Sequence, residues 1–347
     1  MSPFILYILL LTLGLGTTLT FASSHWLLAW MGLEISTLSI MPLMAQHHHP
    51  RAVEATTKYF LIQAGAASLL LFASTTNAWL TGQWNINSDI HIFPATMLIL
   101  ALTLKLGMAP MHFWLPEVLQ GLDLTTGLIL STWQKLAPFI LMCQIMPMNA
   151  SLVTFLGVTS ALVGGWGGLN QTQLRKTMAY SSIAHLGWMI LITQFNQQLA
   201  LLTLMVYLPL TFSAFMVFKV NSSTTINSLA TSWAKAPALT AITPLILLSL
   251  GGLPPLLGFL PKWLILQELT KQGIPLTASI LALSALLSLY FYLRISYTMT
   301  LTIFPNNINA IIPWRLRTSS TLILAATAII SIMLMPLAPA ILTLLSL

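Results

Sequence analysis

Charged side chains inside apolar stretches are the first features of this sequence that could do chemistry. Glu34 lies near the middle of HWLLAWMGLEISTLSIMPLM, Lys105 follows TMLILALTL, Lys135 follows TGLILSTWQ, and Lys262 follows GGLPPLLGFLP. A charged side chain at the centre of a bilayer costs on the order of 2.5–3.5 kcal/mol, even on insertion scales. The four residues therefore predict a pathway for ions or protons.

Lysine suits proton transfer because desolvation favours the neutral amine, whereas a nearby carboxylate favours the charged one. Glu34 is too short to reach the membrane surface, so we expect it to meet a partner, most simply a lysine. One glutamate and three lysines are enough for a charge-coupled relay. The structural alternative is that the lysines extend to the surface or only pair helices, and it is strongest for Lys262.

Histidines add further candidates for this relay. His112 lies in the segment GMAPMHFWLP and His185 in AYSSIAHLGWMI. Either ring could extend the relay or only hydrogen-bond a free carbonyl group. His47–His49 lie in a loop without another ligand at metal spacing, so we predict no metal site. Cys143 is the only cysteine, which excludes an intrachain disulfide and thiolate-held clusters.

Composition places these residues in a membrane protein. Of the 347 residues, 57% are hydrophobic and only 5% are charged. These values predict an all-α polytopic membrane protein with room for about ten to twelve spanning helices. The net charge of +7 would suit a nucleic-acid partner, but the basic residues form no single patch, so we exclude that class. The sequence has no phosphate loop, dinucleotide-binding fingerprint or haem ligand pair, so we expect redox cofactors to bind elsewhere.

Apolar runs and polar connections predict eleven membrane spans. Their approximate limits are 3–21, 25–44, 59–80, 95–119, 124–144, 150–169, 178–193, 199–218, 238–269, 276–303 and 321–343. The fourth span contains Gly107, Pro110 and Pro116, and the ninth contains GGLPPLLGFLPK. Proline lacks an N–H group and its ring clashes with the preceding turn, so we predict that both spans are interrupted.

The two interruptions also suggest an internal repeat. KLGMAPMHFWLPE and SLGGLPPLLGFLPKW share Gly-x-x-Pro and a later proline, and lie about 145 residues apart. They are five predicted spans apart, and an odd number of spans inverts the second copy. We predict one membrane domain over 1–347, with a first five-helix repeat at 1–144, an inverted second repeat at 149–303, and a C-terminal helix at 320–345.

Basic residues in the predicted loops give an orientation. Arg51, Lys219 and Arg315 represent a set that follows even-numbered spans, whereas the loops after odd-numbered spans contain few basic residues. Basic loops stay on the inner side of a membrane. We therefore predict the N-terminus inside and the C-terminus outside.

Three motifs carry a resemblance to a known family. MAPMHFWLPE, QLRKTMAYSSIAHLGW and LGGLPPLLGFLPKW resemble the HFWLPDA, R-x-x-AYSSI-x-H-x-G and GxPP-x-x-GF-x-x-K motifs of antiporter-like proton-pumping subunits of respiratory complex I. SSHWLLAWMGLEI and HPRAVEATTKYFLIQA extend the similarity over nearly the whole chain. The resemblance implies that Glu34 pairs with Lys105, that Lys135 is a central lysine, and that Lys262 is the terminal one. The chain departs from the motifs at Glu117 and around Asp123.

The same resemblance implies a function. The chain would be a core membrane subunit of NADH:ubiquinone oxidoreductase in the mitochondrial inner membrane, with its N-terminus in the matrix and its C-terminus in the intermembrane space. It would move protons without a cofactor of its own, while NADH, FMN, iron–sulfur clusters and ubiquinone bind to other subunits. Its partners would be neighbouring antiporter-like subunits, other membrane and accessory subunits, and phospholipids such as cardiolipin.

Two alternative functions compete with this one. The first is a free-standing sodium/proton antiporter, which would exchange ions without an electron donor. The second is a structural membrane subunit whose buried charges only pair helices. Three buried lysines against one glutamate argue against simple pairing.

Overall fold

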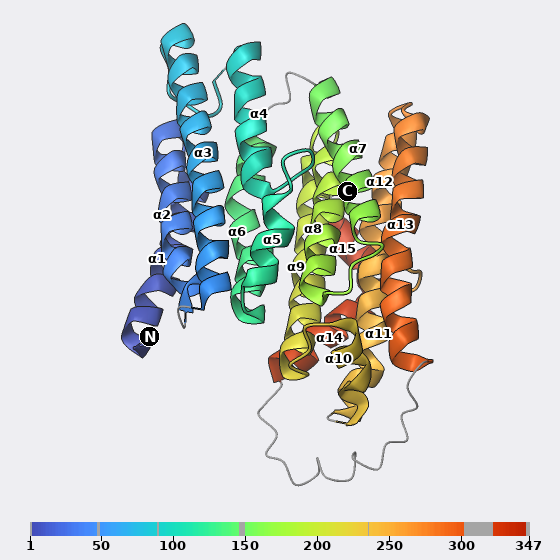
Figure 1. The fold of residues 1–347 in the computed structure, drawn as a ribbon. Coiled ribbons are helices and arrows are strands. Elements are labelled where there is room, and N and C mark those ends of the chain that lie inside the picture. Colours follow the sequence, from blue (N-terminus) through green and yellow to red (C-terminus); the bar gives the residue numbers. More distant parts are fainter. Residues whose placement is uncertain are drawn as a thin grey trace. The chain divides into compact units, whose positions relative to one another are not determined.

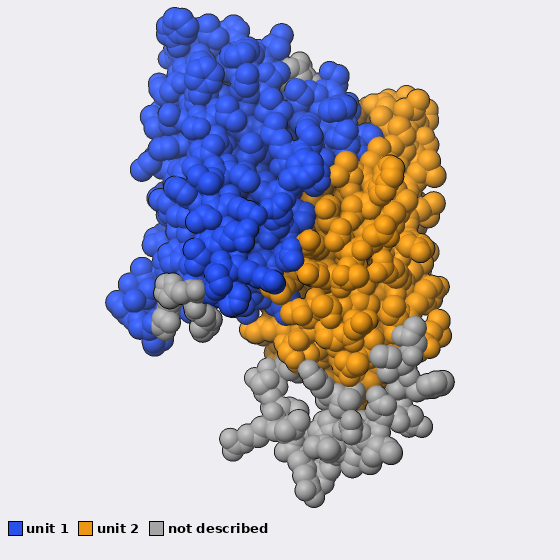
Figure 2. Space-filling model, in the orientation of Figure 1, with its two compact units in different colours: residues 1–160 blue, residues 161–347 orange. Residues whose placement is uncertain are grey.

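The computed structural model describes residues 2–46, 49–88, 90–145, 150–234, 236–301 and 322–344. Over these residues the secondary structure is helical, with two isolated bridges, His25 to Asn85 and Gln173 to Thr225, and no strand (Figure 1). The chain forms two compact units, Met1–Ser160 and Ala161–Leu347 (Figure 2). The predicted all-α class is therefore confirmed for the described part of the chain.

Unit 1 is a bundle of apolar helices. They are α1 (Pro3–Ala22), α2 (Trp26–Met44), α3 (Pro50–Thr81), α4 (Ile92–Leu106), α5 (Trp114–Gly121) and α6 (Leu124–Gln144), and α7 (Ala150–Gly167) runs across the limit of the unit. Helices α1 and α2 pack closely through two glycines. A Cβ atom on Gly16 would lie 2.8 Å from the Gly32 carbonyl oxygen, and the reverse distance is also 2.8 Å. Small residues allow this approach of two membrane helices.

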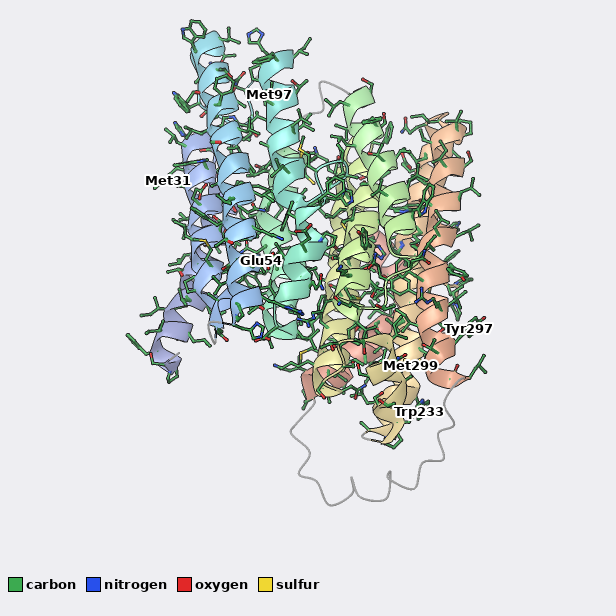
Figure 3. All side chains as sticks on the ribbon, in the orientation of Figure 1. Met31, Glu54, Met97, Trp233, Tyr297 and Met299 are labelled. Atoms are coloured by element: carbon green, nitrogen blue, oxygen red, sulfur yellow. The ribbon has the colours of Figure 1, made fainter. Side chains whose placement is uncertain are left out.

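Unit 2 is built around a central helix, α9 (Gln197–Val220), which packs against α8, α11, α12 and α14. Its other elements are α8 (Leu174–Thr193), α10 (Ile226–Ala230), η2 (Thr231–Ala234), α11 (Pro237–Gly251), α12 (Phe259–Lys271), α13 (Pro275–Thr300), α14 (Leu322–Met333), η4 (Met335–Leu337) and α15 (Ala338–Leu344). The Trp233 indole donates to the Met299 carbonyl over 2.7 Å, which ties η2 to the end of α13 (Figure 3).

Six of the described helices are long and apolar enough to cross a membrane. They are α1, α2, α3, α7, α9 and α13, and three shorter apolar helices are α4, α11 and α14. The chain is thus a multi-pass membrane protein. The predicted total of eleven spans stays a prediction.

Both predicted helix interruptions are confirmed. Helix α4 ends at Leu106 and α5 begins at Trp114, while α11 ends at Gly251 and α12 begins at Phe259. A glycine follows the first half of each interrupted helix, and its φ angle is +76° at Gly107 and +78° at Gly252. Glycine adopts this left-handed conformation without the steric cost of a Cβ atom, so it ends a helix efficiently.

Several predicted boundaries are wrong. Helix α3 begins at Pro50 rather than near residue 59, because proline suits a first turn, the His49 ring accepts from the Arg51 N–H, and Glu54 pairs with Lys58 one turn on. Helix α8 begins at Leu174, four residues earlier than predicted.

The predicted last span is also wrong in one respect. It is divided into α14, η4 and α15, where Pro336 lies in the short 3₁₀ turn and cannot donate a helical hydrogen bond. His47, His48, Arg315, Arg317 and Leu347 lie outside the described residues.

Candidate functional site

The first interruption, residues 107–113, brings the two half-helices α4 and α5 into contact. The Trp114 indole N–H donates to the Leu104 carbonyl over 3.2 Å. A Cβ atom on Gly107 would lie 2.8 Å from Leu115 and 3.0 Å from Trp114, so the glycine leaves room for the start of α5. The last carbonyl groups of a helix have no partner within it. The Leu104 carbonyl accepts from the Gly107 N–H over 3.2 Å as well as from the indole, so Trp114 is its second donor and fixes α5 against the end of α4.

A small cavity in unit 1 brings two of the predicted lysines together. Lys105, 6% exposed, and Lys135, 4% exposed, both line it. The other polar lining residues are Ser36, Thr37, Tyr59, Gln63 and Gln134. The cavity offers about 20 Å³ to the centres of water molecules, and one water needs roughly 10–15 Å³ on this measure. A single polar chamber with room for about one water therefore faces both lysines.

The expected direct pair between Glu34 and Lys105 is not present. Glu34 is half-buried on α2 and its carboxylate accepts from the Thr37 hydroxyl over 3.3 Å. The Lys105 amine is buried and makes no hydrogen bond within the described part of the chain. The Glu34 charge still acts on Lys105 and Tyr59 through space.

An ion-pair network on unit 1 involves a lysine that sequence reasoning overlooked. Lys58 on α3 lies 2.7 Å from Glu117 on α5 and 2.9 Å from Glu54 one turn before it. Both Lys58 and Glu54 fall in a loop predicted from the sequence, whereas the structure places them on α3. Asp123 is exposed at the N-terminal end of α6, where its backbone carbonyl accepts from Gly127 over 2.8 Å.

The second interruption, residues 252–258, is closed by a lysine. The Lys262 amine donates to the Gly251 carbonyl over 2.7 Å. A Cβ atom on Gly252 would lie 2.8 Å from the Lys262 side chain, and one on Gly258 would lie 1.8 Å from the Ser249 carbonyl oxygen. Gly258 is therefore required for α12 to approach the end of α11, whereas Gly252 is required by its φ angle of +78°.

A second cavity, also of about 20 Å³, lies within unit 2 and brings Lys262 and His185 together. The remaining lining residues are Trp188, Met189, Thr203, Val206, Tyr207, Leu210, Gly258, Pro261 and Ile265. The His185 ring is half-buried and its centroid lies 5.6 Å from that of Tyr207. This cavity is less polar than the one in unit 1, but it again places a lysine of an interrupted helix beside a group that can accept a proton.

The remaining candidates have other surroundings. His112 is buried in the first interruption, where Nδ1 lies 3.3 Å from the Pro110 carbonyl and the ring lies 4.4 Å from that of Phe113. It lines neither of the two cavities. Arg294 on α13 donates to the Leu169 carbonyl beyond the end of α7, and was overlooked although it lies in an apolar run. Among the described residues, no three His, Cys, Asp or Glu side chains gather to hold a metal.

Comparison with known families covers almost the whole chain. The family described as NADH:quinone oxidoreductase/Mrp antiporter, TM, matches residues 23–288, and that described as NADH dehydrogenase subunit 2 C-terminus matches residues 289–342. Curated relatives include NADH-ubiquinone oxidoreductase chain 2 from Gadus morhua, 81% identical over 100% of both chains, and its counterpart from Tetraodon nigroviridis, 69% identical over 99% of both.

Solved structures agree with this likeness. A chain of respiratory complex I from Thermus thermophilus, 27% identical, superposes with a TM-score of 0.87 over 99% of this chain and 80% of that one. A chain of the Mrp complex from Dietzia is 14% identical and has a TM-score of 0.79 over 97% of this chain and 75% of its own. The second likeness concerns the fold alone.

Proposed function

The chain belongs to the family of NADH:quinone oxidoreductase and Mrp antiporter membrane subunits, and we propose that it is subunit 2 of a mitochondrial NADH:ubiquinone oxidoreductase, where it moves protons across the inner membrane. One observation carries the proposal: each unit holds a buried lysine at an interrupted helix, and each lysine faces a cavity. Full-length similarity to chain 2 of this enzyme from fish supports the choice of complex.

Two inverted repeats organise this machinery. The two interruptions, 107–113 and 252–258, are offset by 145 residues, and each is followed by a matching segment, WLPE or FLPK. We assign the repeats to 1–144 and 149–303, with residues 320–345 as an additional C-terminal helix. Paired interrupted helices in two halves are a general feature of membrane transporters.

In unit 1, the relay runs between Lys105 and Lys135 through their shared cavity. A water molecule there can carry a proton from one amine to the other, because the lining is polar on several sides. Positive charge on one lysine repels positive charge on the other, so arrival of a proton at one promotes release from its neighbour. The negative charge of Glu34 acts on Lys105 and sets the balance between these two states.

In unit 2, the relay runs between Lys262 and His185. The Lys262 amine loses its hydrogen bond to the Gly251 carbonyl when it turns toward the cavity, and a His185 ring nitrogen can accept the proton there. His112 stays outside this relay, since its ring faces the Pro110 carbonyl. In unit 2, Lys262 thus starts from a defined position, hydrogen-bonded to the Gly251 carbonyl.

Partners and orientation complete the proposal. We place NADH, FMN, iron–sulfur clusters and ubiquinone on other subunits, and neighbouring antiporter-like subunits, accessory subunits and phospholipids such as cardiolipin around this one. The N-terminus and the segments around Arg51 and Arg175 face the matrix, and the C-terminus faces the intermembrane space. Epitope tags at these places, probed on intact inner membranes, test the orientation; labelling of the Arg51 and Arg175 segments from the outer face contradicts it.

The relay is tested in assembled complex by measuring NADH oxidation together with membrane potential. We expect Lys105→Met, Lys135→Met and Lys262→Met each to abolish or strongly reduce proton pumping without preventing assembly. The double variant Glu34→Leu with Lys105→Met distinguishes a relay from simple charge neutralisation: full pumping by this variant identifies a structural subunit. Sodium/proton exchange by the purified chain in vesicles, without NADH, favours a free-standing antiporter.

A further inference from the structure

Helix α5 is short, yet two of its residues line the cavity of unit 1. It has eight residues, Trp114–Gly121, and both Trp114 and Leu115 line the cavity with Lys105 and Lys135. Isolated helices of this length are unstable, so contacts with neighbouring elements must hold α5 in place. Those contacts decide where the cavity wall lies.

Helix α5 is fixed to α3 at three successive levels. Near its start, the Trp114 ring lies against the Tyr59 ring, with centroids 5.8 Å apart. One turn later, Glu117 pairs with Lys58 over 2.7 Å. At its end, a Cβ atom on Gly121 would lie 2.7 Å from the Arg51 carbonyl oxygen, so the two backbones are in close contact. The ion pair is the only charged link of the three.

Lys58 differs from an ordinary surface lysine because it joins two carboxylates from different helices. It binds Glu54 on its own helix over 2.9 Å and Glu117 on α5 over 2.7 Å. Exposed ion pairs usually contribute little to stability, but networks with short distances are the exception. By contrast, the third ion pair among the described residues, Lys271 to Glu268, stays within one helix at 3.8 Å.

Position along the chain links this network to the lysine cavity. Lys58 is next to Tyr59, which lines the cavity, and Glu117 lies one helical turn after Trp114, which also lines it. Residues three apart on a helix share a face, so a shift at Glu117 moves Trp114 with it. Trp114 in turn donates to the Leu104 carbonyl, next to Lys105.

We propose that Lys58 and Glu117 are positioning residues that hold α5 so that Trp114 closes the cavity between Lys105 and Lys135. This rests on the proposed function, because the cavity matters only where those lysines transfer protons. The ion pair itself carries no proton in this scheme. It keeps the wall in place while the charges on the lysines change.

The first measurement tests the ion pair directly. Hydrogen exchange of the backbone amides of residues 112–122 is compared in assembled complex for Lys58→Gln, Glu117→Gln and the matched control Glu54→Gln, with Glu54 placed on α3 (Figure 3). We expect about threefold faster exchange for the first two and unchanged exchange for the control, which keeps the link between α3 and α5. Equal exchange in all three overturns the proposal.

A charge exchange separates positioning from a general loss of folding. Lys58→Glu with Glu117→Lys is made on the Glu54→Gln background, so that the carboxylate introduced on α3 meets no like charge one turn away. We expect each single reversal to accelerate exchange and the exchanged pair to restore it. Failure of the exchanged pair to restore protection, when its complex assembles as well as the single reversals, overturns the proposal.

The second measurement is the number of protons pumped per NADH oxidised. We expect Glu117→Gln to lower this ratio at least twofold while NADH oxidation continues, and the exchanged pair to recover it. An unchanged ratio despite faster amide exchange overturns the positioning role and leaves the proposed relay intact. Unchanged pumping by Lys105→Met instead contradicts the proposed function, whatever the amide exchange of α5.

Discussion

The two interruptions of the helical structure begin alike and are held together by different groups. Each begins with a left-handed glycine, Gly107 or Gly252, and each ends where a short second half-helix starts. In unit 1 the indole of Trp114 donates to the Leu104 carbonyl in the last turn of α4. In unit 2 the corresponding aromatic residue is Phe259, which has no donor, and Lys262 satisfies a carbonyl at the end of α11.

This difference decides what each lysine is free to do. In unit 1 the Trp114 indole contacts the end of α4, and the Lys105 amine, which makes no hydrogen bond among the described residues, lines the polar cavity. Lys262 has a structural contact that must be given up before it can act elsewhere. In unit 1, Trp114 contacts the end of the first half-helix and Lys105 carries the charge. In unit 2, Lys262 does both.

The matching segments WLPE and FLPK extend the comparison to charge. Glu117 and Lys262 occupy the same place in them, at the fourth residue of the second half-helix. Glu117 points to Lys58 at the partly exposed edge of α3, whereas Lys262 points to the buried carbonyl of Gly251. The same position in the motif therefore holds a carboxylate in an exposed ion pair in unit 1, and a buried amine on a backbone carbonyl in unit 2.

The largest effect is expected at Gly258, where backbone meets backbone. A Cβ atom there would lie 1.8 Å from the Ser249 carbonyl oxygen, so Gly258→Ala must displace α12. The corresponding residue in unit 1 is Phe113, which is 72% exposed. We expect Gly258→Ala to prevent assembly of the complex on native gels, and Phe113→Ala to assemble normally. Gly14→Ala is the control for a glycine with open space; normal assembly of Gly258→Ala contradicts the comparison.

A second effect separates the two lysines by stability rather than activity. Lys262→Met leaves the buried Gly251 carbonyl without its partner, which costs about 1–3 kcal/mol, whereas Lys105→Met breaks no hydrogen bond of the Lys105 amine. Both substitutions should stop pumping. Thermal unfolding in detergent measures the difference, with a lower midpoint for Lys262→Met only. Equal midpoints would show that the two lysines have the same structural role.

A smaller effect is expected when unit 1 is given the aromatic residue of unit 2. Trp114→Phe removes the indole N–H from the Leu104 carbonyl and costs about 0.5–1.5 kcal/mol. That carbonyl then keeps only its hydrogen bond from the Gly107 N–H, and the start of α5 loses its link to the end of α4 beside Lys105. We expect slower proton pumping with normal assembly. Pumping as fast as in the native chain would mean that the link between the indole and α4 is not needed for the relay.

The smallest effect concerns the ion pair on α12. Lys271 and Glu268 lie 3.8 Å apart on one helix, and Lys271 is 63% exposed. We expect Lys271→Gln to leave assembly, unfolding midpoint and pumping unchanged, in contrast to Lys58→Gln. A loss of pumping in Lys271→Gln equal to that in Lys58→Gln would remove the distinction between a pair within a helix and one between helices.

Local features of the sequence predicted the interruptions and the buried lysines. Gly107 and Pro110 limit the backbone through their own covalent structure, so their effect needs no knowledge of distant residues. The charge of Lys262 in an apolar run is equally local. The same reasoning missed the first two turns of α3, residues 50–58, because Glu54 and Lys58 are typical of a polar loop until their pairing within a helix is considered.

Partners distant in the chain could not be predicted in this way. The pair of Lys58 and Glu117 joins residues 59 positions apart, and the hydrogen bond from Trp114 depends on how α5 folds back on α4. The expected contact of Glu34 with Lys105 failed for the same reason, since composition sets which charges need partners but not which faces of two helices meet. Arg294 gave a local signal, its charge within an apolar run, that was not used.

The contact of Gly258 with Ser249 has a mechanical consequence. Where two half-helices touch through their backbones, as at Gly258 and Ser249, neither can yield by rotating a side chain. The second interruption is therefore stiff. The first interruption has no such backbone contact between its two half-helices: the Trp114 indole links α5 to α4, and α5 is held on α3 instead. A displacement of α12 should therefore pass directly to α11, whereas a displacement of α5 should pass to α3.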